Sequence, residues 1–320
     1  MGKDMQQQFT KRRLQELDFL KGVLIVLVIS FHLVFIEQKY PYAKQVVYAF
    51  HMPAFLLVSG YLMNIGKPCK AFLRTMLWFT VPYIVMESGY VVMAAQLSIA
   101  EHIDVLTLFA FLEKLLLHPI GPYWYLQTLI ICGFTYYAVF QWQRISLVTR
   151  MLFLALLFWF YASTVRIVSL PLALYFLGGI LLRQSGLAFV SLFPTSWLTL
   201  PVMVLLVSYP QNFQAESAGS VFIVWLAVAN ILLFWRYSPS ALCRIVCYLG
   251  RNTLPLFLFS PMFTLLCKQL VPFLQTEPTG LLFLAVALMV CTFGSLCVGK
   301  AMDALRLSSC FCGRKRIVMT

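Results

Sequence analysis

His32, His51 and Glu87 are ionisable side chains that lie well inside apolar stretches of the chain, away from the charged ends of those stretches. Ionisable groups at membrane depth are costly and usually serve a function. At 1.5 Å per helical residue, all three fall roughly 18 to 22 Å from the inner edge of a hydrocarbon core about 30 Å thick. Because a free imidazole has a pKa of about 6.5, we expect His32 to act as a general base or a nucleophile. Glu87 or His51 would orient its ring, as the acid of a triad orients the base.

The helix face around Glu87 is polar. Its neighbours at offsets of three, four and seven residues are Tyr90, Tyr83 and Thr80, so this face should point into the protein. An ionised carboxylate there needs a partner. We therefore predict a histidine ring nitrogen within hydrogen-bond reach of Glu87, directly or through one water or a tyrosine hydroxyl. The alternative is a polar network that only holds the helices together.

A polar stripe leads from His32 toward the start of its own predicted helix. Lys21 and Asp18 precede His32 by 11 and 14 residues, which at about 100° per residue puts the three side chains on one face. That face suits a long polar ligand, although Lys21 also fits interfacial snorkelling. Lys70 and Arg74, at the start of the third predicted helix, are candidates for binding phosphate groups, and the positive-inside bias explains them equally well.

Aromatic residues gather at the other end of the predicted helices, at positions 123–125. Such a group is typical of the aromatic belt at a membrane surface, and it is also suited to stacking on a sugar ring. We take Tyr123 and Trp124, with Arg166 on the same predicted side, as candidate contacts of a carbohydrate ligand, which we call the acceptor.

The composition excludes a soluble protein. Hydrophobic residues make up 61% of the 320 residues and charged residues only 11%, against about 25% charged residues in soluble chains. The net charge of +13 does not indicate nucleic acid, because the basic residues lie between apolar runs. The nine cysteines are scattered, and Cys310 and Cys312 lack the spacing of zinc ligands. We expect no metal, no permanently bound cofactor, and one membrane domain over residues 1–320.

Ten apolar runs predict an all-α integral membrane protein, a bundle of about ten transmembrane helices. A further stretch, 104–117, mixes apolar residues with charges and is interpreted as an interfacial helix. The runs cover residues 20–36, 46–65, 72–95, 123–140, 151–164, 169–182, 197–209, 220–235, 252–270 and 280–298.

The basic residues predict the orientation of the bundle. With the N-terminus inside, 19 of the 24 Lys and Arg residues fall in inner segments, which the positive-inside rule favours. Residues 1–17 and 300–320 would then be basic cytoplasmic ends of a multi-pass protein of the inner membrane. The first run lacks a cleavage site and is interpreted as a signal anchor.

Several motifs in this order resemble those of the membrane acyltransferase-3 family, the bacterial multi-span O-acyltransferases of surface glycans. The most specific is ELDFLKG at residues 16–22, followed by His32; the next is HMPAF at 51–55, leading to SGYL at 59–62. Weaker similarities are PYWYL at 122–126, FLGG at 176–179 and LGRNTL at 249–254.

Two positions depart from the family pattern. Members often carry two arginines spaced R-x-x-R before the third span, whereas Lys70 and Arg74 are four residues apart, so only Arg74 matches. Many members also carry a third histidine after the G-x-x-[ST]-L block. This chain has Ser260 there, within FLFSP at 257–261.

The resemblance implies transfer of an acyl group, acetyl above all, from cytoplasmic acyl-CoA to a hydroxyl of a carbohydrate or glycolipid at the outer face. Acetyl-CoA would be a co-substrate bound by Asp18, Lys21, Lys70 and Arg74. The other partners would be membrane lipids and a carbohydrate or lipid-linked glycan. The resemblance leaves open whether the acyl group is transferred directly or through an acyl-histidine intermediate. The alternative function is a proton-coupled transporter or flippase that uses the same histidines, although such proteins tend to carry inverted repeats, and we find none.

Overall fold

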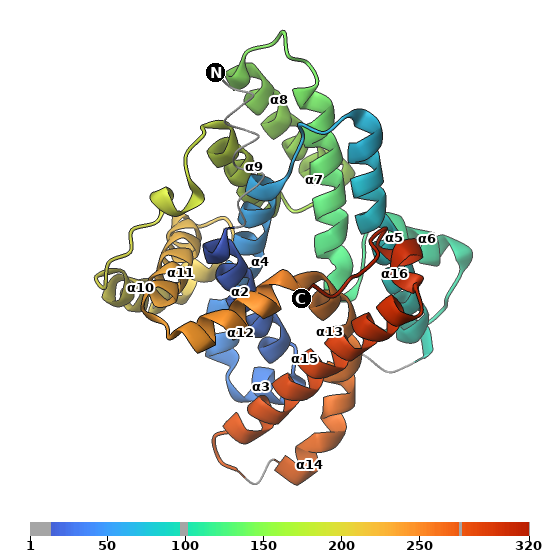
Figure 1. Ribbon diagram of the computed structural model, residues 1–320, viewed down its shortest axis with the longest axis vertical. Coiled ribbons are helices and arrows are strands. Elements are labelled where there is room, and N and C mark those ends of the chain that lie inside the picture. Colours follow the sequence, from blue (N-terminus) through green and yellow to red (C-terminus); the bar gives the residue numbers. More distant parts are fainter. Residues whose placement is uncertain (1–13, 97–101, 275–276, 320) are drawn as a thin grey trace.

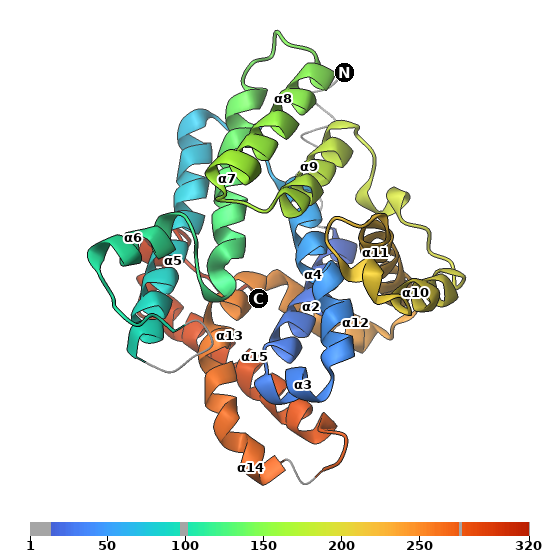
Figure 2. The ribbon, with the colours of Figure 1, turned by 180° about the vertical axis from the view of Figure 1, so that it is seen from behind.

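The structure, a computed structural model, describes residues 14–96, 102–274 and 277–319, and in these residues it contains helices and no strand. The basic residues of segment 1–13 lie outside this part of the chain. Helices α2 and α4 lie in the middle of the molecule (Figures 1 and 2). On one side of them are α10 and α11, and on the opposite side α5 and α6, while α12 crosses α2.

The α-helices form a bundle that closely follows the apolar runs. They are α2 (Gln15–Phe31), α3 (Val34–Lys39), α4 (Pro41–Leu62), α5 (Cys69–Gln96), α6 (Leu108–Leu116), α7 (Trp124–Phe140), α8 (Leu147–Phe160), α9 (Leu170–Gln184), α10 (Thr199–Val207), α11 (Ala218–Tyr237), α12 (Ser240–Arg251), α13 (Thr253–Cys267), α14 (Val271–Leu274), α15 (Leu281–Ala304) and α16 (Leu307–Phe311).

Six of the described helices are long and apolar enough to cross a membrane, which makes this a membrane protein. They are Pro41–Leu62, Cys69–Gln96, Leu147–Val165, Ala218–Tyr237, Thr253–Leu274 and Leu281–Ala304, and the apolar helix Leu170–Gln184 is shorter. Helix α10, in the run predicted at 197–209, has nine residues and rises only about 14 Å. The count of ten spans and the cytoplasmic ends stay predictions. A helix does form within 104–117, as α6.

The first predicted span, 20–36, is not one helix. Helix α2 ends at Phe31, His32 is its C-cap, and the chain resumes as α3 at Val34. The His32 amide donates to the carbonyls of Val28 and Ile29, whereas Leu33 has the extended angles φ −81° and ψ 106°. Irregular backbone at membrane depth is tolerated where it borders a cavity, and His32 lies at such a place.

Glycines let two pairs of helices come unusually close. A Cβ on Gly250 of α12 would lie 1.6 Å from the carbonyl oxygen of Asp18 in α2, and one on Gly22 would lie 2.1 Å from that of Val246. Between α4 and α9, a Cβ on Gly179 would lie 2.0 Å from the Leu57 carbonyl oxygen. Small residues at crossings are how membrane helices gain packing. The glycines of the motifs at 16–22, 176–179 and 249–254 therefore set the core geometry.

Candidate active site

His32 and His51 line one cavity of about 850 Å³, which we call the histidine chamber. His32 comes from the end of α2 and His51 from the middle of α4, where it is buried. The Tyr48 ring lies near both, with its centroid 6.1 Å from that of His32 and 5.0 Å from that of His51. The Tyr48 hydroxyl donates to the Phe31 carbonyl over 3.1 Å. Tyr48 precedes His51 by one helical turn, a spacing that could have marked it in the sequence.

The hydrogen bonds of the two histidines fix their tautomer. Nδ1 of His32 is 2.7 Å from the carbonyl oxygen of Val28, and Nδ1 of His51 is 2.7 Å from that of Val47. A carbonyl oxygen only accepts, so Nδ1 must carry the proton in each neutral ring. Nε2 then keeps its lone pair, the form that a general base or a nucleophile needs. Each helix thus holds its own imidazole ready to take a proton.

Charged groups stand at the chamber's rim. Glu37 of α3 forms an ion pair with Lys44 of α4, and both line the chamber. The Lys44 ammonium also lies 5.2 Å from the centre of the Tyr48 ring, a cation–π contact. Both Glu37 and Lys44 act electrostatically on His32.

Glu87 is not among the described residues that line the chamber, and neither His32 nor His51 forms the predicted hydrogen bond to it directly. A link through one water or a tyrosine hydroxyl stays a prediction. The Glu87 side chain is fully buried, and Oε1 accepts from the Ile120 amide over 2.7 Å. Among the described residues, the ring hydrogen bonds of His32 and His51 go to their own helices. Similar depth along two helices does not fix which way their side chains face, so the estimated depth alone could not establish a contact. Glu87 thus holds the loop before α7, and Tyr83 of the same helix donates its hydroxyl to the Leu115 carbonyl of α6 over 2.6 Å.

A second cavity of about 290 Å³, the apolar passage, adjoins the chamber, and Met52 and Phe257 line both. Its walls are mostly apolar. Inside it, the hydroxyls of Ser59 and Tyr125 are hydrogen-bonded at 2.7 Å, which brings the SGYL and PYWYL motifs together. The sequence offered no signal for this pair beyond the motifs themselves.

The polar stripe of α2 connects the two cavities, as its helical spacing predicts. Lys21 and Ile25 line the apolar passage, and Val28 and His32 line the histidine chamber. One face of α2 therefore runs from the passage to the chamber, so a ligand in the passage would point toward His32.

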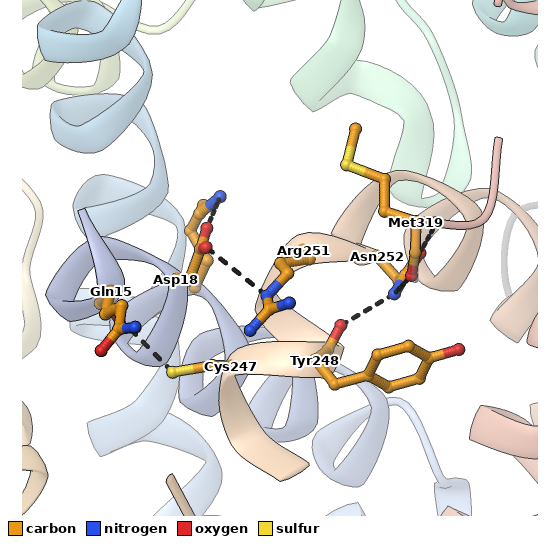
Figure 3. A network of polar contacts seen from close by, with 8 residues as sticks. Gln15, Asp18, Cys247, Tyr248, Arg251, Asn252 and Met319 are labelled. Atoms are coloured by element: carbon orange, nitrogen blue, oxygen red, sulfur yellow. Dashed lines mark hydrogen bonds and ion pairs between the residues drawn. The ribbon is translucent and has the colours of Figure 1, made fainter. Parts of the chain in front are cut away.

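Asp18 anchors this stripe at its start (Figure 3). The buried Asp18 carboxylate forms an ion pair with the Lys21 ammonium at 2.9 Å and a second, longer one with Nε of Arg251 at 3.8 Å. Arg251 belongs to the LGRNTL motif and is carried by α12, which the close approach at Gly250 holds against α2. A buried carboxylate between two cations keeps its charge compensated. Asp18 therefore positions Lys21 and Arg251.

A third cavity of about 390 Å³, the basic mouth, adjoins the apolar passage and shares Lys67, Thr75, Phe79 and Leu254 with it. Arg74 lines it, as does Arg314 from the end of the chain. Lys67, which sequence reasoning did not select as a candidate ligand, also lines it and donates to the Thr75 hydroxyl over 2.9 Å. Lys70 is exposed and, in the described chain, is not among the residues that line the three cavities.

Cys312 also lines the basic mouth. Burial raises the pKa of its thiol to about 12, with Asp303 adding to the rise and Arg314 opposing it. A thiol with that pKa is protonated at neutral pH and a poor nucleophile. The histidines are therefore the stronger nucleophile candidates.

Of the three expected acceptor contacts, one lines the histidine chamber and the other two are not among its described residues. Trp124 lines the histidine chamber. Tyr123 is buried and its hydroxyl donates to the Leu258 carbonyl over 2.8 Å, so its ring packs the interior rather than a sugar. Arg166, exposed in a left-handed turn with φ 59°, is not among the described residues of this chamber. Ser260 is buried in α13, and the residue one turn before it, Phe257, lines the chamber instead.

The chain belongs to the acyltransferase-3 family, whose model, described as an acyltransferase domain, matches residues 14–298. This identifies a membrane acyltransferase. The match begins at α2 and ends within α15, so it includes both histidines and the three motifs whose glycines allow the close helix packing. No match is found among curated proteins or among solved structures.

Proposed function

We propose that the protein is an O-acetyltransferase of the inner membrane, with both ends in the cytoplasm, that transfers acetyl groups from acetyl-CoA to a hydroxyl of a carbohydrate or glycolipid at the outer face. The observation that carries the proposal is the tautomer of His32. Its Nδ1 proton is held by the Val28 carbonyl, so Nε2 can act as a base in a chamber that adjoins a passage with a basic mouth.

The donor is proposed to occupy the three cavities in order. Its phosphates would lie among Lys67 and Arg74 at the basic mouth, because guanidinium and ammonium groups bind phosphate strongly. Its pantetheine arm would lie in the apolar passage, with the Ser59–Tyr125 hydroxyl pair facing its amides. The thioester would then lie near Met52, which lines passage and chamber alike.

The reaction needs one proton carrier. His32 Nε2 takes the proton of the acceptor hydroxyl as the oxygen attacks the thioester carbonyl. The new C–O bond forms, the C–S bond breaks, and the imidazolium returns its proton to the departing thiolate, which leaves as free CoA. His51, in the same tautomer and in the same chamber, would polarise the acceptor or share the proton. The route through an acyl-imidazole uses the same Nε2 atom as a nucleophile.

An adjoining cavity supports a glycolipid acceptor. It has a volume of about 730 Å³ and shares Pro171, Tyr175 and Ala215 with the histidine chamber. The rest of its wall, between α4, α9 and α11, is mainly apolar, including Leu174 and Val224. We propose that a lipid chain of the acceptor occupies this side cavity while its sugar lies in the chamber.

The test is acetyl transfer by the purified full-length protein in detergent. Acetyl-CoA labelled in the acetyl group is supplied with a lipid-linked glycan, and both free thiol and labelled glycan are measured. The proposal predicts that the two products form in equal amounts. Transport of the glycolipid without thiol release, measured in vesicles, would instead support the transporter alternative.

A further inference from the structure

The C-terminal segment 307–319 is folded onto the bundle, although its charge pattern predicted a basic cytoplasmic tail. After α15 the chain reverses at Arg306, which has a φ of 58°. The short helix α16 then packs beside α5 (Figure 1). Beyond it, Ile317 and Val318 are 4% exposed and Cys312 is 1% exposed. A solvated tail would not bury these side chains.

Two polar side chains of the bundle hold this segment. The Asp303 carboxylate accepts from the Ile317 amide over 2.7 Å and from the Val318 amide over 3.2 Å. The Asn252 side chain accepts from the Met319 amide over 2.7 Å and donates to the Met319 carbonyl over 3.0 Å (Figure 3). Asn252 therefore bonds the segment as a neighbouring strand would. These bonds engage the amides of residues 317–319 and the Met319 carbonyl, and so fix the path of the backbone there.

Two glycines show how closely the segment fits. A Cβ on Gly299 of α15 would lie 2.7 Å from Cγ2 of Val318, so the helix leaves room for that side chain. Gly313 has a φ of 61°, which favours glycine, and a Cβ on it would lie 1.6 Å from the Trp78 ring of α5. The segment is thus positioned against α5 beside the basic mouth.

This position makes the segment a wall of the basic mouth. Arg74, Thr75 and Trp78 line the cavity from α5, and Cys312, Gly313 and Arg314 line it from the segment. The cations among the lining residues are Lys67, Arg74 and Arg314, and none of the described lining residues is acidic. Asp303 acts electrostatically on Cys312, but both of its oxygens accept hydrogen bonds from the segment. Three cations around one cavity favour a ligand with several negative charges.

The family match ends at residue 298, before the segment and before Asp303. We propose that Arg314 is a phosphate-binding residue of the acyl-donor site, delivered by a C-terminal segment that lies outside the matched domain. The ligand is the phosphorylated nucleotide of a CoA thioester, so this inference rests on the proposed function. An anionic lipid headgroup has the same phosphate chemistry, and the experiment separates the two.

The experiment compares Arg314→Gln with Arg316→Gln in the full-length protein. Arg316 lies in the same segment, is exposed, and is not among the described residues that line the cavity, so its variant makes the same charge change away from the site. Affinity for CoA is measured by calorimetry in detergent free of anionic lipid. We expect Arg314→Gln to weaken CoA binding about 5- to 20-fold, the effect of losing one charge-assisted contact, and Arg316→Gln to leave it within about twofold.

A donor without a nucleotide provides the specific control. S-acetylpantetheine carries the thioester arm and no phosphate, so Arg314→Gln should leave its KM unchanged while raising the KM for acetyl-CoA. An equal rise for both donors would show a structural defect and overturn the inference. So would unchanged CoA affinity in Arg314→Gln, or a defect that appears only as lost binding to vesicles containing phosphatidylglycerol.

A second variant tests delivery by the segment. Asp303→Ala removes the acceptor of the Ile317 and Val318 amides and leaves Arg314 in the chain. We expect CoA affinity to fall as in Arg314→Gln, with thermal unfolding of the bundle confirming that it is folded. Wild-type affinity in folded Asp303→Ala would contradict delivery. Failure of the wild-type protein to bind CoA at all would instead overturn the proposed function, and the inference with it.

Discussion

At the scale of single residues, the chemistry depends on which nitrogen of each imidazole carries the proton. His32 and His51 donate Nδ1–H to carbonyls of their own helices, an arrangement that sequence spacing alone could not reveal. The histidines themselves were predictable, because an ionisable group in an apolar run is conspicuous. Their partners were not, because the carboxylate nearest in estimated depth, Glu87, faces another part of the bundle.

Arg74 gives a direct test of the donor site. A phosphate contact by a guanidinium loses its two-pronged geometry when Arg becomes Lys and its charge when Arg becomes Gln. CoA affinity should therefore fall in the order wild type, Arg74→Lys, Arg74→Gln, with a total loss of about 10-fold or more. Lys70→Gln is the matched control, since Lys70 lies outside the described linings of the cavities. Equal effects of Lys70→Gln and Arg74→Gln on CoA affinity, measured by calorimetry, would show that Arg74 only contributes to the positive-inside bias.

Glu87 is expected to act on stability first. Its Oε1 accepts from the buried Ile120 amide, two residues before Pro122 of the chamber wall. Glu87→Gln keeps an oxygen acceptor, whereas Glu87→Ala leaves the amide without one, at a cost of about 1–3 kcal/mol. The thermal midpoint should fall more in Glu87→Ala than in Glu87→Gln. A large loss of activity in Glu87→Gln with a wild-type thermal midpoint would restore a catalytic role for the carboxylate.

At the scale of elements, the site depends on how closely α2 and α12 pack. A Cβ at Gly250 would lie 1.6 Å from the Asp18 carbonyl oxygen, so Gly250→Ala must push the helices apart and displace Arg251 from Asp18. We expect a loss of at least about 1–3 kcal/mol, the usual cost of overpacking, and a lower thermal midpoint. Gly89→Ala is the control, because a Cβ at Gly89 meets no described atom within 4 Å. The packing account fails if both variants unfold at the same temperature.

The elements also show where sequence periodicity stops being informative. The apolar runs predicted most helices, because burial in lipid or protein selects the same residues. The break at His32 was not predicted, because the run of apolar residues continues past it. The docking of the C-terminal segment was missed as well. Its charges suggested solvent, while its anchors, Asn252 and Asp303, lie far from it in the sequence or on the helix before it.

At the scale of the whole molecule, four cavities adjoin one another in a row: the basic mouth, the apolar passage, the histidine chamber and the apolar side cavity. Each adjoining pair shares residues of its walls. Motifs far apart in the chain meet along this path: His32 and His51 in the chamber, and Ser59 with Tyr125 in the passage. The sequence contained the motifs, but only the fold shows that they line one route.

The side cavity makes a prediction about the acceptor. Gly178 lines it, and the nearest atom to a Cβ there would be Cδ1 of Leu57 at 3.4 Å, so a larger side chain would extend into the cavity. Gly178→Leu should raise the KM for a lipid-linked glycan several-fold and leave the KM for the same glycan without lipid unchanged. Equal changes for both acceptors would argue against a lipid chain in this cavity.

The central claim is that His32 Nε2 takes the acceptor proton, and one measurement tests it most directly. Acetyl transfer to the lipid-linked glycan is measured for wild type, His32→Ala and His118→Ala, with thermal midpoints for each. His118 is exposed and, in the described chain, is not among the residues of the chamber, so it controls for loss of a histidine. We predict wild-type stability for both variants, a roughly 10²- to 10⁴-fold loss of activity in His32→Ala, and near-normal activity in His118→Ala. Full activity in folded His32→Ala would contradict the account.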